Sequence, residues 1–259
     1  GILFWHTDYG LIFLFLIEKK GASKSPFIYF CLVNTILHIE TATKNCSVAL
    51  SRNGKQIALV EKFSMEYSHS EQLHGFIQQV FEKANLNLSD LDAVAVSKGP
   101  GSYTGLRIGV AAAKGICFAL DLPLLGVNSL QVITEIYQPL SNEILFPMFD
   151  ARRMEVYSLV LNNKKEIIRE TSADIITEDT FMDFPKDKTW VFFGSGAEKC
   201  KSIFTGEHIK YVDDIQHPSA SGMIPLAEKA FKESAFEDLA YFEPFYLKEF
   251  FTPSPKKKK

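Results

Sequence analysis

Residues 99–105 read GPGSYTG and lie between a short apolar run and a stretch of small residues. A strand, a glycine-rich turn and a helix in that order can bind phosphate, because free backbone N–H groups and the helix dipole favour an anion. Ser102 and Thr104 offer hydroxyls that could cap the helix. The loop lacks the Gly-Lys-Ser/Thr ending of a P-loop and the third glycine of a dinucleotide fingerprint. A tight turn without ligand therefore fits Gly99 and Gly101 as well as a nucleotide site does.

Two acidic residues directly follow apolar runs, a position from which a carboxylate could hold a metal–phosphate group. Glu40 comes after ILHI and is accompanied by the hydroxyls of Thr41 and Thr43. Asp150 comes after ILFPMF and precedes a pair of arginines at 152–153, which could direct charge into a cleft. With Mg-ATP these residues would suit a small-molecule kinase. Ordinary turn chemistry explains the same residue types equally well.

The histidines and cysteines do not form a metal-binding pattern. His69 and His74 are five residues apart, about 140° around a helix, so they cannot share a metal ion. His38 lies in an apolar run, which favours a buried and hydrogen-bonded side chain. The four cysteines are scattered without a C-x-x-C pair. This argues against a zinc site and a disulfide framework, and it favours a reducing compartment, the cytoplasm.

The composition is that of a globular protein, with 46% hydrophobic and 23% charged residues over 259 positions. The net charge is −3, and four of the lysines form a tail at 256–259, which we expect to be flexible. The rest of the chain is acidic, and an acidic protein is poorly suited to binding nucleic acid by itself. The apolar runs at 11–17 and 27–33 are far shorter than the ~20 residues of a membrane helix. We expect residues 1–33 to be an extension outside the main fold, with a packed or partner-binding arm as the alternative.

The elements that would position these residues follow an α/β pattern. Apolar runs predict strands at 36–40, 47–51, 56–61, 93–96 and 124–127. The second half repeats the order of strand, acid, turn and strand around Asp150, and WVFFGSGAEKC then predicts a strand, a Gly-x-Gly turn and a helix. From the residues alone this echo is either an internal repeat or a chance hairpin. The alternation predicts two similar lobes.

Two amphipathic helices are predicted in the first half, at residues 68–84 and 104–120. Ser68 and Glu71 have the spacing of a capping box for the first helix. Each helix carries one wide apolar stripe, and the second also has a face of small residues that would let a neighbouring helix approach closely. The apolar stripe of a helix can pack on the protein's own sheet. Only a second apolar face, which that sheet does not cover, would require a partner.

Five segments, in order, resemble the TsaB (YeaZ) family: ILHIETATKNCSVAL, SKGPGSYTGLRIGVAAAKGI, LLGVNSL, DARRMEVY and PFYLK. The resemblance runs from about residue 34 to 248. It implies two ribonuclease-H-like lobes of the actin and sugar-kinase superfamily. We accordingly expect an extension at 1–33, an N-terminal lobe with the partner helices at 34–136, a C-terminal lobe at 137–248 and a basic tail at 249–259.

The resemblance implies a non-catalytic scaffold subunit. Its partner would be TsaD, the related subunit that adds threonylcarbamoyl to N6 of the adenosine beside the anticodon in tRNA. The two metal-binding histidines of TsaD align with Ser129 and Ile133, which cannot hold that ion. The glycine-rich loop would then belong to a vestigial nucleotide site that binds no metal. An independent kinase using Glu40 and Asp150 is the alternative, and a metal-dependent peptidase is a third.

The resemblance also implies that the two predicted helices pack against the same helices of TsaD. TsaE would be a further partner, tRNA would be reached only through the complex, and a homodimer remains open when TsaD is absent. No cofactor of its own and no membrane are expected, and ATP or ADP would lie at the interface with TsaD. The expected interface residues are Leu73, Phe76, Ile77, Val80, Leu106, Val110, Ala112, Ala113, Ile116 and Ala119.

Overall fold

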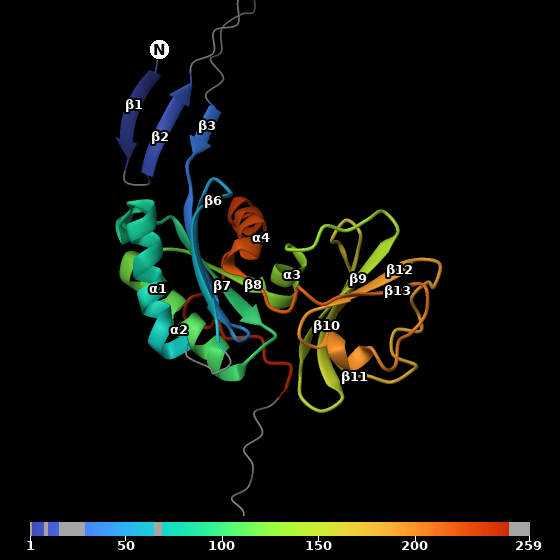
Figure 1. Cartoon of the computed structure of the whole chain (residues 1–259). Helices are drawn as coiled ribbons and strands as arrows, with labels where there is room; N and C mark the ends of the chain where they lie inside the picture. Colours follow the sequence, from blue (N-terminus) through green and yellow to red (C-terminus); the bar gives the residue numbers. More distant parts are fainter. Residues whose placement is uncertain (1, 8–9, 16–28, 65–68, 249–259) are drawn as a thin grey trace, which may run out of the picture.

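Two five-stranded sheets with the same internal order form the two lobes (Figure 1). The computed structural model describes residues 2–7, 10–15, 29–64 and 69–248. In the first sheet the order is β6-β5-β4-β7-β8, and in the second it is β11-β10-β9-β12-β13. In each lobe, three strands form an antiparallel meander, and the last two run parallel to the first. The echo in the sequence is therefore an internal repeat, and the two-lobed α/β fold is confirmed.

The predicted strands are present, most of them extended by a residue or two. The strands of the first lobe are β4 (Thr35–Glu40), β5 (Asn45–Arg52), β6 (Lys55–Phe63), β7 (Ala93–Gly99) and β8 (Leu124–Asn128). Those of the second lobe are β9 (Glu143–Asp150), β10 (Glu155–Asn162), β11 (Ile167–Ile175), β12 (Thr189–Phe193) and β13 (Ile209–Val212).

Helices cover both faces of the first sheet. On one face lie α1 (His69–Ala84) and α2 (Tyr103–Leu120), whose apolar stripes pack on β4, β5 and β7. On the other face lie α3 (Ser129–Thr134) and α4 (Ala220–Lys232). Short 3₁₀ turns occur at Leu88–Asp90 and Ala197–Cys200, so the helix expected after the second Gly-x-Gly is a single short turn.

The helix α4 packs on the first lobe although it follows the strands of the second lobe in the chain. Its Met223 and Ala227 are buried against Ile36, Ala95 and Leu125 of the first sheet. The segment after it also returns, because Glu237 forms a bridge with Leu124 in β8. The expected boundary, which placed all of 137–248 in the second lobe, therefore differs from the packing.

The N-terminal residues form an antiparallel sheet of their own, separate from the two lobe sheets. Its strands are β1 (Ile2–Thr7), β2 (Gly10–Phe15) and β3 (Tyr29–Leu32). Residues 16–28, Ser68 of the expected capping box and the lysine tail lie outside the described residues. Within the described chain, α2 is the one helix whose length and composition would let it cross a membrane.

Candidate functional site

The glycine-rich loop connects β7 to α2, as the sequence predicts. Ser102 is the N-cap of α2, and its Oγ accepts a hydrogen bond from the N–H of Gly105 at 3.3 Å. Thr104, the second expected cap, lies inside the first helical turn and is exposed. One hydroxyl therefore caps the helix.

The glycines of this loop make room for the protein's own backbone. A Cβ at Gly101 would lie 2.4 Å from the carbonyl oxygen of Ala42, and one at Gly105 would lie 2.2 Å from that of Thr41. The N–H of Ser102 donates to the same Ala42 oxygen at 2.7 Å. On the other side, a Cβ at Gly99 would meet the Phe245 carbonyl at 2.8 Å. Other segments of the chain thus pack against the loop on these sides.

Glu40 and Asp150 have different surroundings in the two lobes. Glu40 is fully buried, and its Oε1 accepts the N–H of Ala42 at 2.7 Å. Burial raises the pKa of Glu40 to about 7. Asp150 is half exposed in the other lobe, where its Oδ1 pairs with Lys199 Nζ at 2.5 Å. The structure gathers Glu40, Thr41, Gly101 and Ser102 in one place, but no hydrogen bond or ion pair among the described residues joins Asp150 to them.

The histidines have separate structural surroundings, as their spacing predicts. His69 is buried and donates from Nε2 to the carbonyl oxygen of Thr43 at 2.7 Å, whereas His74 is exposed. His38 is buried and shares a 2.8 Å hydrogen bond with Ser51, and burial lowers its pKa to about 3. No cluster of three or more His, Cys, Asp or Glu side chains suited to a metal occurs in the described part of the chain.

Ser129 and Ile133, which the resemblance matches to metal-binding histidines, lie in α3, inside the protein. Ser129 and Ile133 are both fully buried. Ile133 packs with Leu145 and Phe149 of β9, so α3 links the first lobe to the second through apolar contacts. The Asn128 side chain caps α3 by accepting from the N–H of Leu130 at 2.8 Å. Ile133 thus serves packing between the two lobes.

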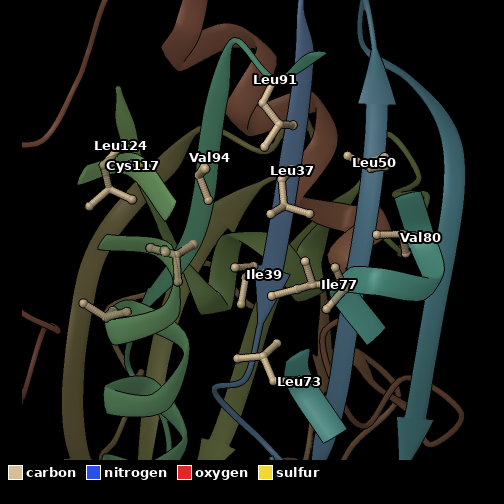
Figure 2. Close-up of a cluster of buried hydrophobic side chains, with 14 of the residues drawn as sticks. Leu37, Ile39, Leu50, Leu73, Ile77, Val80, Leu91, Val94, Cys117 and Leu124 are labelled. Carbon is tan, nitrogen blue, oxygen red and sulfur yellow. The ribbon is translucent and has the colours of Figure 1, made fainter. Parts of the chain in front are cut away.

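Six of the expected interface residues belong to the protein's own core, and that part of the assignment is wrong. Figure 2 shows Leu73, Ile77 and Val80 of α1 among the side chains of β4 and β5. Their exposed fractions are 8% or less. The main apolar stripe of a helix on a sheet faces that sheet, so it is not available to a partner. The six residues corrected are Leu73, Ile77, Val80, Leu106, Val110 and Ala113.

A second apolar face does exist, and it lines a groove between α1 and α2. The groove has a volume of about 570 Å³. Of the expected residues, Ala112, Ile116 and Ala119 line it, whereas Phe76 is half-buried against the core. We call this surface the helix groove, and its lining residues are Ser70, His74, Leu88, Ile108, Ala111, Ala112, Gly115, Ile116, Ala119 and Leu120.

Sequence reasoning missed six residues of this groove: Ser70, His74, Leu88, Ile108, Ala111 and Leu120. A signal for the α2 members was present, because apolar or small residues recur at 108, 112, 115–116 and 119, a second stripe with helical spacing. Leu88 gave no such signal, since it lies in a 3₁₀ turn after α1 and reaches the groove only through the fold.

A family model, curated relatives and a solved structure all match this chain over most of its length. The family model described as TsaD, tRNA N6-adenosine threonylcarbamoyltransferase, matches residues 64–257. The chain is 29% identical over 219 residues to the tRNA threonylcarbamoyladenosine biosynthesis protein TsaB of Escherichia coli, covering 82% of this chain and 94% of that one. It is 31% identical over 172 residues to the Bacillus subtilis protein of the same name, covering 65% and 74%. The structure of YeaZ from Pseudomonas aeruginosa superposes with a TM-score of 0.74 at 24% identity, over 83% of this chain and all of that one.

Proposed function

The chain belongs to the TsaB (YeaZ) family of the actin and sugar-kinase superfamily, and we propose that within tRNA threonylcarbamoyladenosine biosynthesis it is a non-catalytic subunit that binds and activates TsaD. A role in that biosynthesis follows from relatives that align over most of both chains. The helix groove supports the binding role, and the closed glycine-rich loop supports the non-catalytic one.

The helix groove is the observation that carries the proposal. Its α2 side consists of small and apolar residues, among them Ala111, Gly115 and Ala119, which are exposed in the single chain. Small residues let a second helix approach closely, and their burial removes apolar surface from water. Phe118, next to the groove residue Ala119, is 83% exposed. An apolar helix pair of a related subunit is the partner that this surface fits.

The site geometry also supports a non-catalytic role over the kinase alternative. The carboxyl of Glu40 is enclosed by its own turn, and Asp150 is tied to Lys199 in the other lobe. Mg²⁺ on a nucleotide needs at least one carboxylate that it can reach, and the carboxyl of Glu40 is fully buried. Any ATP or ADP in the complex would accordingly lie at the interface with TsaD, outside the closed loop of this chain.

Within the complex, TsaE is the further partner that we propose, and tRNA is reached through the assembled subunits. The acidic body of the chain agrees with this indirect contact. When TsaD is absent, the same groove could instead hold a second copy of this chain, and that state remains open. The buried free thiols of Cys46, Cys117 and Cys200 suit a reducing compartment, and we place the complex in the cytoplasm.

The proposal is tested by placing a charge on the exposed groove residues. Ala111→Arg and Ala119→Arg should each weaken binding of purified TsaD about a hundredfold or more, because a buried unpaired charge costs several kcal/mol. Titration calorimetry measures the affinity, and threonylcarbamoylation of tRNA in the reconstituted system measures the function. Circular dichroism should be unchanged, since both side chains point away from the core.

Gln79→Arg is the matched control, because Gln79 is exposed on α1 and lies outside the groove. It should bind TsaD like the unmodified chain. If both alanine variants bind TsaD normally while folded, the partner surface lies elsewhere and the assignment of the groove is wrong.

A further inference from the structure

The last described residues run from α4 back along the first lobe, and several contacts hold them there. Phe242 is buried in the core beneath α2. Lys114 of α2 donates from Nζ to the carbonyl oxygens of Ala240 at 3.3 Å and Phe242 at 3.0 Å. Lys98 pairs with Glu237 at 3.4 Å. The segment therefore reaches the glycine-rich loop along a fixed path, drawn in red in Figure 1.

At the glycine-rich loop the segment contacts both strand and helix. The N–H of Phe245 donates to the carbonyl oxygen of Lys98 at 2.6 Å, at the end of β7. Its own carbonyl oxygen would lie only 2.8 Å from a Cβ at Gly99, and Gly99 has a φ of +113° that other residues rarely adopt. The ring of Tyr246 packs against that of Tyr103 with centroids 4.8 Å apart, at the first residue of α2.

Two residues later the same segment reaches the second lobe. Lys248 Nζ donates to the carbonyl oxygen of Ala151 at 3.1 Å and forms an ion pair with Glu155. Both partners belong to the turn at 150–155 that joins β9 to β10. Lys199 also holds this turn, through the carboxylate of Asp150 and the carbonyl oxygen of Glu155. The turn is thus fixed from two sides, and one of the two is the C-terminal segment.

We propose that residues 243–248 act as a strap that couples the glycine-rich loop of the first lobe to the 150–155 turn of the second. Phe245 and Tyr246 hold the first lobe and Lys248 holds the second, so the chain itself joins the two lobes beside this loop. The strap also contacts the start of α2, and it therefore links the position of the second lobe to the helix that lines the groove.

Hydrogen–deuterium exchange on the full chain tests this coupling by its cross effect. Lys248→Ala removes the anchor in the second lobe and should speed exchange about tenfold in residues 98–105 of the first lobe. Tyr246→Ala removes the anchor in the first lobe and should speed exchange about tenfold in residues 150–155 of the second. Lys248→Arg and Tyr246→Phe keep the charge and the ring, and each should restore most of the protection.

Tyr241→Ala is the control for general destabilisation, because Tyr241 lies in the same segment and is 85% exposed. It should leave exchange unchanged in both regions. If each variant speeds exchange only beside its own substitution, the contacts are local and the strap does not couple the lobes. A uniform increase over all strands, or equal effects from Tyr241→Ala, would also overturn the proposal.

Discussion

The carboxyl group of Glu40 ends the central strand β4 and is fully buried. Its pKa rises from 4.5 to about 7, mainly because burial disfavours the charged form, and hydrogen bonds from Ala42, Ser97 and Thr41 offset only part of that effect. The carboxyl group of Glu40 is thus held as part of the core.

This burial makes folding stability depend on pH. Between pH 4.5 and 7 the folded chain keeps a proton on Glu40 that the unfolded chain has released, so the free energy of unfolding falls as pH rises. The shift corresponds to roughly 3 kcal/mol. Glu40→Gln is neutral at every pH and keeps an acceptor for Ala42. We expect the two proteins to be similar near pH 4.5 and the variant to be more stable by up to about 3 kcal/mol at pH 8.

Urea unfolding at a series of pH values measures this difference. His38 contributes the opposite slope, because its lowered pKa makes stability rise with pH, but it is present in both proteins and cancels in the comparison. A difference that stays constant from pH 4.5 to 8 would show that Glu40 does not take up a proton on folding.

At the scale of the element, α2 has two different relations to its surroundings. Near its start it crosses the turn between β4 and β5 so closely that only glycine fits at 105. Near its end it lines the helix groove, where Gly115 has nothing within 4 Å of a Cβ position. The same residue type thus marks close packing at one end and open surface at the other.

The same substitution should therefore have opposite effects at the two ends. Gly105→Ala should lower the free energy of unfolding by about 1–3 kcal/mol, because the added methyl group meets the Thr41 carbonyl. Gly115→Ala is the matched control and should raise it by up to about 1 kcal/mol through helix propensity. Urea denaturation of the two variants measures both changes. Equal effects would contradict the close packing at 105.

Much of this element was predictable from its sequence. The helix was identified correctly from the apolar stripe of Leu106, Val110, Ala113 and Cys117. Apolar side chains that recur every three or four positions lie on one face of an α-helix. The spacing of the apolar residues does not show which element or partner covers that face. A stripe that packs on the protein's own sheet and one that meets a partner have the same spacing, so Leu106 and Val110 were assigned to the wrong neighbour.

At the scale of the molecule, the N-terminal strands stand apart from the repeat. The side chain of Asn34 is tied into the first lobe, through Asn53 and Glu228. A chain beginning at Asn34 should keep its unfolding midpoint within about 2 °C and bind TsaD unchanged. A chain beginning at Ile36 is the control, because it also loses the hydrogen bond from Thr35 to Asp92.

The control should unfold roughly 5–10 °C lower, since several part-buried hydrogen bonds are removed. Scanning calorimetry compares the three chains. A drop of that size already in the chain beginning at Asn34 would show that residues 1–33 stabilise the lobes, as in the alternative of a packed arm.

The repeat itself was visible in the sequence, because the residues of both lobes predict a strand, an acidic residue, a turn and a second strand in the same order. The sequence did not show which of the two sheets α4 packs against. Its apolar residues Met223 and Ala227 would suit either sheet, and only the three-dimensional path shows that they cover β4 and β8. The site was predicted in outline, but the closure of the glycine-rich loop by Ala42 and Phe245 depends on contacts between segments far apart in the chain.

The return of α4 and Phe242 to the first lobe has a consequence for synthesis on the ribosome. The strands β4 to β8 are made early, yet the part of one sheet face that α3 leaves open is covered by a helix made after the whole second lobe. While that helix is still inside the exit tunnel, Ile36, Ala95 and Leu125 remain without their cover. The nascent first lobe should therefore depend on chaperones throughout elongation of the second, and a truncated message ending before residue 220 should yield an aggregating fragment.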